Sequence, residues 1–409
     1  MGIAHAGLAA RWQPLATWFY PIVWWAYIVL VDGFARRRGG QGVLAGGWRG
    51  VAGPACMSVV FWLIHEAVNL RIANWYYVGV PESRPERWLG ITLSFATVIP
   101  LLLATHQALL LTRLLGPCKV RRRGVPEWVR RAMQGAGVAC LVLPLAFPRH
   151  AFWLLWGFVY LTLEPLNHRA GRPSLLADLE VGSVRRLLAA LIAGLACGLL
   201  WEGWNFWAGG KWIYTVPGLP DWRWFEMPPL GFLGFPLLAL AALAFHAAVT
   251  GWWRRGGRAG RLALAAGGVV FSVAVLGAME HVTIDAVRPV LADVTPLAAD
   301  ARRSLPAAGV RSVDALARVA DADLNALATR LNQPRASVGA ARDWARLATH
   351  RGMGAANADR LWAVGIRDVA ALAALSPEGL AWRLGSGAPE PRKLAVWING
   401  ARPRPVDRP

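Results

Sequence analysis

Eight apolar runs, each close to the length of a membrane-crossing helix, constrain the fold of this 409-residue chain more than any other feature. A helix needs about 20 mostly apolar residues to cross a bilayer, and a short one needs about 17. The chain is 56% hydrophobic and only 17% charged, whereas soluble domains carry about a quarter charged residues. This composition excludes a disordered chain, a collagen and an ordinary soluble enzyme, and it predicts a polytopic membrane protein. The runs are 15–31, 52–70, 91–112, 133–148, 150–166, 187–205, 230–250 and 262–279.

The basic residues predict how these spans are oriented. Nineteen Lys and Arg residues fall in alternate loops, against seven in the N-terminus and the other loops. Loops that stay in the cytoplasm retain positive charge. We therefore expect a multi-pass protein of the prokaryotic inner membrane whose C-terminal domain lies outside the cytoplasm. Loops 71–90 and 206–229 then face outward, where their Trp and Tyr residues fit an interfacial belt.

The membrane part contains an internal repeat at an offset of 136 residues, which becomes 132 residues upstream. The matches are Glu66 with Glu202, Asn69 with Asn205, Arg87 with Arg223, Pro100 with Pro236, NWYYVGVP with KWIYTVP, and upstream Trp24 with Trp156 and Asp32 with Glu164. Each half is about four helices long, so both halves have the same orientation. The pattern predicts two parallel repeats related by a pseudo-two-fold axis along the membrane normal, and sites in such proteins often lie where the repeats meet.

The repeated Glu-x-x-Asn pairs are the principal candidates for chemistry. A spacing of three residues puts both side chains on one helix face, and ionisable residues within spans suggest function. The alternative is that each carboxylate is solvated or paired with a basic neighbour. Asp32 and Glu164 are expected to form salt bridges that anchor helix ends. The candidate catalytic residues are Glu202, Glu226 and Glu66, and the candidate ligand-binding residues are Asn69, Asn205, Lys211 and Tyr214.

Two resemblances accompany the segment WEGWNFWAGGKWIYTVP and the downstream WFEMPPLGFLGFP. Over roughly 15–290 the chain resembles a family of uncharacterised prokaryotic polytopic membrane proteins. It is also faintly similar to the membrane-embedded lycopene cyclases, through Trp201-Glu202, Lys211 to Tyr214 and Glu226-Met227-Pro228. Those enzymes carry paired Glu just after the Pro, whereas this chain has Pro229-Leu230-Gly231. The second resemblance implies a pocket for a long apolar molecule with a carboxylic acid near one end.

The tail, residues 288–409, has no run long enough to span and repeats at an offset of 56 residues, over about 294–348 and 350–402. The second copy, GMGAANADRLWAVGI followed by RDVAALAALSPEGLAWRL, resembles the helix-hairpin-helix family. That resemblance implies a turn whose backbone N–H groups contact a nucleic-acid phosphate. A protein partner is the favoured interpretation, and nucleic acid is the alternative. The residues concerned are Gly352, Gly354, Arg351, Arg360, Arg392 and Lys393.

The predicted fold is therefore all-α: a membrane bundle of about eight spans in two parallel repeats, plus a small soluble helix-hairpin-helix-like domain. The first repeat covers 1–132 with 133–148 as its last short span, the second covers 149–287, and the soluble domain follows. The predicted function is an intramembrane polar site for a lipid or isoprenoid-like molecule near the outer half of the bilayer, with no cofactor and no metal. A membrane-anchored assembly protein and a transporter are the alternatives.

The side of the tail can be tested with a single Cys in place of Ser386, in a background without the four native Cys residues. We expect a membrane-impermeant thiol reagent to label this residue on intact cells. Labelling only after lysis would place the tail in the cytoplasm and would mean that one of the short spans is wrong.

Overall fold

The computed structural model describes residues 1–402 apart from 11, 13, 117 and 218–222. About 70% of the chain is helical, which confirms the prediction of a mostly helical protein. The chain divides into two compact units. The first, which we call the helical unit, consists of Met1–Asn74, Arg84–Gly209 and Trp222–Thr283. The second, the C-terminal unit, consists of Trp75–Ser83, Gly210–Asp221 and Ile284–Pro409.

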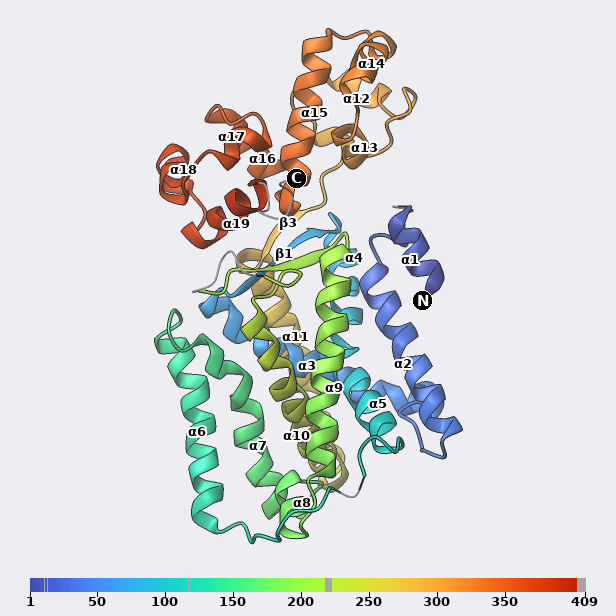
Figure 1. Ribbon diagram of the computed structural model, residues 1–409, viewed down its shortest axis with the longest axis vertical. Coiled ribbons are helices and arrows are strands. Elements are labelled where there is room, and N and C mark those ends of the chain that lie inside the picture. The colour runs from blue at the N-terminus through green and yellow to red at the C-terminus, as the bar shows by residue number, and fades with distance from the viewer. Residues whose placement is uncertain (11, 13, 117, 218–222, 403–409) are drawn as a thin grey trace. The chain divides into compact units, whose positions relative to one another are not determined.

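In the helical unit the long helices run lengthwise (Figure 1). Its elements are α1 (Gly2–Ala9), α2 (Phe19–Arg37), α3 (Gly47–Ile72), α4 (Arg84–Phe95), α5 (Val98–Leu110), α6 (Glu127–Ala146), η1 (Phe152–Gly157), α7 (Phe158–Arg169), α8 (Leu175–Glu180), α9 (Arg185–Trp207), η2 (Pro229–Leu233), α10 (Gly234–Arg255) and α11 (Arg258–Val282). Helices α6 and α7 pack closely, and a Cβ on Gly137 would lie 2.4 Å from the Thr162 hydroxyl. The 3-10 helix η1 precedes α7, so the short segments around Pro148 form a tight helical hairpin.

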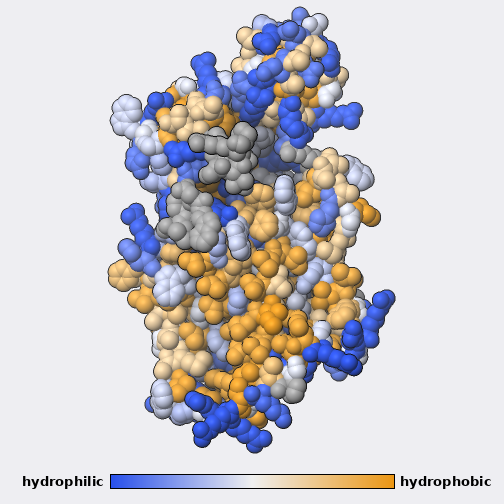
Figure 2. Space-filling view, viewed as in Figure 1, coloured by the Kyte–Doolittle hydropathy of each residue, from blue (hydrophilic) through white to orange (hydrophobic). Residues whose placement is uncertain are grey.

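Five helical stretches of the described residues are long and apolar enough to cross a membrane. They are Gly50–Ile72, Arg84–Leu110, Arg185–Trp207, Pro229–Arg255 and Arg258–Val282. In α11 only 17% of the apolar window is buried, and Val269, Val270 and Val273 are exposed. Figure 2 shows an apolar surface over the helical unit, with hydrophilic side chains at the end that carries α8. The expected spans at 15–31, 133–148 and 150–166 are not among the five, so the number eight stays a prediction.

Proline positions explain where two of these stretches change their geometry. Pro100 has no N–H to donate to the Ala96 carbonyl, and the chain breaks between α4 and α5 at this point. Ser58 of α3 satisfies two backbone groups at this break. Its hydroxyl donates to the Phe95 carbonyl (2.5 Å) and accepts the Ile99 N–H (2.9 Å). Pro236 is the third residue of α10, as Pro100 is the third residue of α5.

A buried ion pair joins the start of α4 to the end of α11. The Arg87 guanidinium donates from Nε and Nη2 to the two oxygens of Glu280, at 2.9 and 2.5 Å. Trp88 Nε1 donates to the same carboxylate at 2.8 Å. Both charged side chains are largely buried, so the carboxylate depends on these donors rather than on water.

The C-terminal unit contains a three-stranded sheet that sequence patterns do not predict. Its strands are β1 (Trp75–Val80), β2 (Lys211–Tyr214) and β3 (Ile284–Val287), in the order β2-β1-β3. Strand β1 pairs antiparallel with β2, with Trp75 opposite Tyr214 and Val78 opposite Lys211, and parallel with β3. The aromatic segments expected in outward loops are therefore paired strands. Tyr76, Val78, Ile213 and Ala286 form one apolar cluster with Val396.

The rest of the C-terminal unit is made of short helices around one apolar core that includes Trp344, Leu361 and Trp397. They are η3 (Leu291–Asp293), α12 (Ala299–Ser304), α13 (Val313–Ala317), η4 (Asp321–Asp323), α14 (Leu324–Leu331), α15 (Arg335–Thr349), η5 (His350–Gly352), α16 (Gly354–Ala363), α17 (Val369–Ala373), α18 (Pro377–Leu384), η6 (Gly385–Gly387) and α19 (Pro391–Ala401).

One turn and cap recur in this unit 56 residues apart. Gly309 and Gly365 both have positive φ, at 91° and 81°. The next residue in each case donates its N–H back across the turn: Val310 to Leu305 and Ile366 to Leu361, both at 2.9 Å. Ser312 and Asp368 then cap the N-termini of α13 and α17 by accepting the third N–H of each helix, which is the usual role of these residue types.

His350 connects η5 to α19 inside the C-terminal unit. Its Nε2–H donates to the Trp397 carbonyl at 2.9 Å. Burial lowers the pKa of His350 below its usual value, the bond to the carbonyl opposes this shift, and the charge of Arg351 adds to it. The folded chain therefore favours the neutral imidazole.

The Arg87–Glu280 pair generates a stability prediction. Arg87→Met leaves a buried carboxylate without its cation, which should lower the free energy of unfolding by about 3 kcal/mol. Thermal unfolding in detergent measures this effect. The control is Arg131→Met, which breaks an exposed ion pair with Glu127 and should change stability much less. Equal destabilisation by the two variants would contradict the prediction.

His350 generates a pH prediction. Its pKa is about 6.5 in an unfolded chain and lower in the folded one. Stability from the neutral imidazole is therefore complete above about pH 6.5 and declines as the pH falls toward the folded pKa. Amide hydrogen exchange in α15 and α19, corrected for intrinsic rates, should lose protection over this acid range in the wild type and less so in His350→Gln. His281→Gln, an exposed position in the helical unit, is the control. If His350→Gln loses as much protection as the wild type, the acid sensitivity belongs to another group.

Candidate functional site

The Glu-x-x-Asn pairs lie near the C-terminal ends of α3 and α9. Glu66, Asn69, Glu202 and Asn205 are all fully buried. Asn69 shapes the exit from α3, because its side-chain oxygen accepts the Asn74 N–H (2.9 Å) and its carbonyl accepts the N–H of the left-handed C-cap residue (2.9 Å). The four side chains face the interior of the helical unit rather than its surface.

An aromatic cluster lies next to both acids. We use this term for Tyr20, Trp24, Tyr27, Trp62, Trp201 and Trp204. Trp62 Nε1 donates to Glu66 Oε1 at 2.9 Å, and the Trp62 ring lies 5.1 Å from that of Trp201. The Tyr20 ring lies 6.1 Å from the Trp201 ring, and Trp201 directly precedes Glu202 on α9. The cluster therefore connects the acids of α3 and α9.

Similar contacts recur between residues at the repeat offsets. The Leu44 N–H donates to Asp32 (3.0 Å), and the Leu176 N–H donates to Glu164 (2.9 Å). In the aromatic contacts, Trp24 packs on Trp201 (6.0 Å between ring centroids) and Trp156 packs on His65 (5.7 Å).

Asp32 and Glu164 have different side-chain partners. Asp32 also forms the expected salt bridge, with Arg36 at 3.0 Å. Glu164 accepts a hydrogen bond from the Ser174 hydroxyl (2.8 Å), and it forms no ion pair with a described residue.

The other three candidate residues of the predicted site are divided between the units. Glu226 is fully buried in the helical unit, and its carbonyl accepts an N–H of Arg223 at 3.3 Å. Lys211 and Tyr214 lie on β2 in the C-terminal unit. Five of the seven residues therefore share the helical unit. Among the described residues, no group of three or more His, Cys, Asp or Glu side chains is placed to hold a metal ion.

A groove of about 760 Å³ lies between α2 and α5. Its walls are mainly apolar and include Leu30, Phe34 and Leu109, and Arg37 also lines it. Tyr27 lines the groove and also belongs to the aromatic cluster, since its ring lies 6.1 Å from that of Trp204. The Tyr27 hydroxyl bonds Thr105 at 2.9 Å. Tyr27 is thus part of both the groove wall and the aromatic cluster.

The glycine turn of the tail packs against the sheet of its own unit. A Cβ on Gly352 would lie 2.4 Å from Val78 of β1, and one on Gly354 would lie 2.8 Å from Ala286 of β3. The Met353 N–H of the turn already donates to the His350 carbonyl at 2.9 Å. These contacts give both glycines a packing role.

Three of the four basic residues expected to bind a partner also contact their own unit. Lys393 forms an ion pair with Asp285 of β3 and lies 4.9 Å above the Tyr76 ring. Arg392 donates to the Thr215 carbonyl at 3.1 Å. The Arg351 side chain leaves no room for a Cβ on Gly400, its nearest atoms being 2.8 Å away. Arg360 is exposed, and the binding of a protein or nucleic acid by this set stays a prediction.

Sequence reasoning missed a second polar site, at the end of the helical unit that carries α8. Arg172, Arg186, Arg254 and Arg255 line one pocket there. In the sequence these residues serve only as positive charges that orient the spans. The signal that could have indicated a site is the presence of His and Thr on the neighbouring turns of α10, at His246 and Thr250.

The comparisons with known proteins concern the tail alone. Residues 296–393 match the family model described as a domain of unknown function, DUF4332. This match agrees with a separate C-terminal domain of uncharacterised function. Neither the curated proteins nor the solved structures give a match to the chain.

Proposed function

We propose that this chain is a multi-pass protein of the prokaryotic inner membrane that binds a long apolar molecule, a lipid or an isoprenoid-like compound, in its helical unit. The proposal includes eight spans, with the acids Glu66 and Glu202 in the outer half of the bilayer and the C-terminal domain outside. A protonated carboxyl group beside the aromatic cluster would meet the polar end or a double bond of the bound molecule.

The surface of the helical unit supports the membrane part of the proposal. Five apolar stretches have the necessary length, and α11 carries apolar side chains on an exposed face. A helix that is apolar on its outer side is stable in lipid and unfavourable in water. Arg254 and Arg255 at the end of α10, with Arg185 and Arg186 at the start of α9, give one end of the unit a basic rim, as expected for a cytoplasmic side.

The recurring contacts support the two repeats. A two-fold operation that exchanges the halves turns the Leu44–Asp32 bond into the Leu176–Glu164 bond. The same operation exchanges Trp24–Trp201 with Trp156–His65. In the C-terminal unit the β1–β2 register is self-complementary by itself, because an exchange at the offset of 136 residues turns Trp75 opposite Tyr214 into Lys211 opposite Val78. A self-complementary register is the mark of an isologous contact around a two-fold axis.

The observation that carries the functional proposal is the complete burial of Glu66 and Glu202 next to one aromatic cluster. Ionisable groups inside membrane helices are costly and generally mark functional sites. Acids that served only to meet water at the interface would keep exposed oxygens. The apolar groove between α2 and α5 supports the class of ligand, since its volume of about 760 Å³ and apolar walls suit a hydrocarbon chain.

Glu202→Gln tests the proposal, because it keeps the shape of the side chain and removes its acid. The full chain would be purified in mild detergent from wild-type and variant cells, and extracted apolar molecules would be quantified by mass spectrometry. We expect the variant to lose roughly three- to tenfold of one co-purifying compound, since a neutral hydrogen bond contributes about 0.5–1.5 kcal/mol.

The matched control is Glu127→Gln, an identical change at a partly exposed residue in the first turn of α6. This variant should retain the compound at the wild-type level. Intrinsic Trp fluorescence and size-exclusion elution would establish that both variants are folded. Wild-type occupancy in a folded Glu202→Gln protein would remove the proposal.

A further inference from the structure

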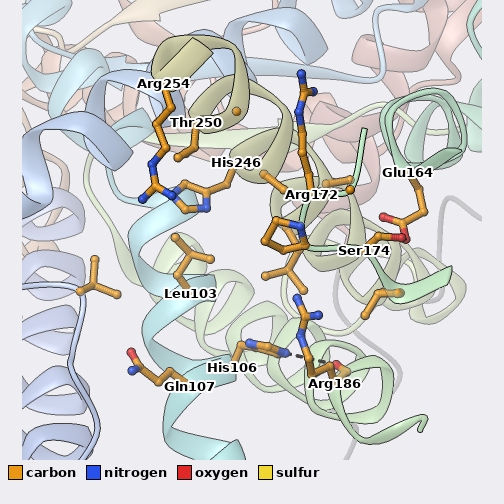
Figure 3. Close-up of a pocket in the computed structure, with 18 of the residues that line it drawn as sticks. Leu103, His106, Gln107, Glu164, Arg172, Ser174, Arg186, His246, Thr250 and Arg254 are labelled. Atoms are coloured by element: carbon orange, nitrogen blue, oxygen red, sulfur yellow. Dashed lines mark hydrogen bonds between the residues drawn. The ribbon is translucent and has the colours of Figure 1, made fainter. Parts of the chain in front are cut away.

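A pocket of about 580 Å³ lies inside the helical unit, among α5, the segment between α7 and α8, α9 and α10. Figure 3 shows the side chains of Arg172, Arg186 and Arg254 around it, together with His106 and His246. Apolar side chains such as Leu103 complete the wall. Polar groups from four separate elements therefore converge on one partly open pocket.

The charges around this pocket are not balanced. Arg186 is paired with Asp178 at 3.1 Å. Arg172, Arg254 and Arg255 form no ion pair with any residue that the structure describes. The one acid in the lining, Glu164, accepts hydrogen bonds from the Ser174 hydroxyl and the Leu176 N–H. The pocket thus carries an excess of positive charge.

Two buried donors in the lining have no partner among the described residues. They are Nε of Arg172 and the hydroxyl of Thr250. Most buried polar atoms in folded proteins are hydrogen-bonded, and the exceptions call for an explanation. Burial and the charge of Arg255 also lower the pKa of Arg172, an effect that a bound anion would reverse.

The position of Arg172 is fixed by its neighbours. Its guanidinium lies 5.4 Å from the Trp252 ring centroid, and Nη1 lies 3.5 Å from the side-chain oxygen of Asn167. Gly251 leaves room for it, because a Cβ there would lie 2.3 Å from Nε. The fold therefore holds Nε of Arg172 in place without supplying an acceptor for it.

We propose that this pocket binds a phosphate-bearing anion. Guanidinium groups match phosphate oxygens in geometry and charge, and the Thr250 hydroxyl and the His246 imidazole supply further donors at other angles. The volume exceeds that of a lone phosphate and leaves space for the group esterified to it. The inference does not depend on the proposed function, since it uses none of the residues assigned to the apolar ligand.

The phosphate group could belong to a lipid headgroup or to a soluble phosphate ester, and both offer the same oxygens to the pocket. Basic pockets between membrane helices on the cytoplasmic side bind anionic lipid headgroups, and a soluble phosphate ester would use the same donors. The purified full chain would be titrated with inorganic pyrophosphate in detergent. It would also be compared in phosphatidylcholine nanodiscs with and without phosphatidic acid. Thermal stability reports binding in both arms.

Arg172→Gln and Thr250→Val should each weaken the response, Arg172→Gln by roughly tenfold or more in apparent affinity. Gly251→Ala displaces Arg172 without changing the charge and should act in the same direction. The control is Arg258→Gln, which removes the same charge from an exposed residue just beyond α10 and should leave the response unchanged.

A response to pyrophosphate that depends on Arg172 identifies a soluble phosphate compound, and a response to phosphatidic acid alone identifies a lipid headgroup. Equal losses in Arg172→Gln and Arg258→Gln would mean attraction by net charge and would overturn the site. The absence of any response in both arms would overturn it as well, since a folded wild-type protein then ignores both sources.

Discussion

The cost of placing carboxylates among apolar helices governs the arrangement of the helical unit. An unpaired buried charge costs several kcal/mol, so each acid needs a donor that the fold brings to it. Trp62, one turn earlier on α3, donates a hydrogen bond to Glu66. Asp32 and Glu164 take backbone N–H groups from the segments that follow their helices. Asp32 and Glu164 thereby hold the segments that follow α2 and α7, and the Trp62 ring packs beside Glu66.

Hydropathy alone predicted the mostly helical character of the chain and the positions of the five stretches that are long and apolar enough to cross a membrane. The burial of the Glu-x-x-Asn pairs was also predictable, because the spacing places both side chains on one helix face. The three-stranded sheet was not predictable from the sequence. A short segment such as NWYYVGVP suits an interfacial belt as well as a strand. Its pairing partner lies far away in sequence, so no local signal distinguishes the two.

The other features that the sequence did not predict arise from contacts between segments that are distant in sequence. Lys211 and Tyr214 follow Glu202 closely in sequence, yet they belong to β2 and to a different compact unit. Arg172 and Arg254 come together because α10 places Gly251 beneath the Arg172 side chain. Nothing in either loop predicts that approach. The glycine turn at Gly352 is similar: its motif suggests contact with a phosphate, and its packing against Val78 emerges only from the tertiary structure.

The central position of β1 has a consequence for the order of assembly. Both of its neighbours in the sheet come later in the chain, β2 after α9 and β3 after α11. Contacts between residues so distant in sequence form slowly, since a large loop must close first. During synthesis β1 therefore has both edges unpaired until α9 and β2 have been made, and the edge that pairs with β3 stays unpaired until α11 has followed. The tail, which packs on this sheet through Val396 and Lys393, can complete its fold only after that closure. The finished C-terminal unit thus reports that every preceding helix has been synthesised.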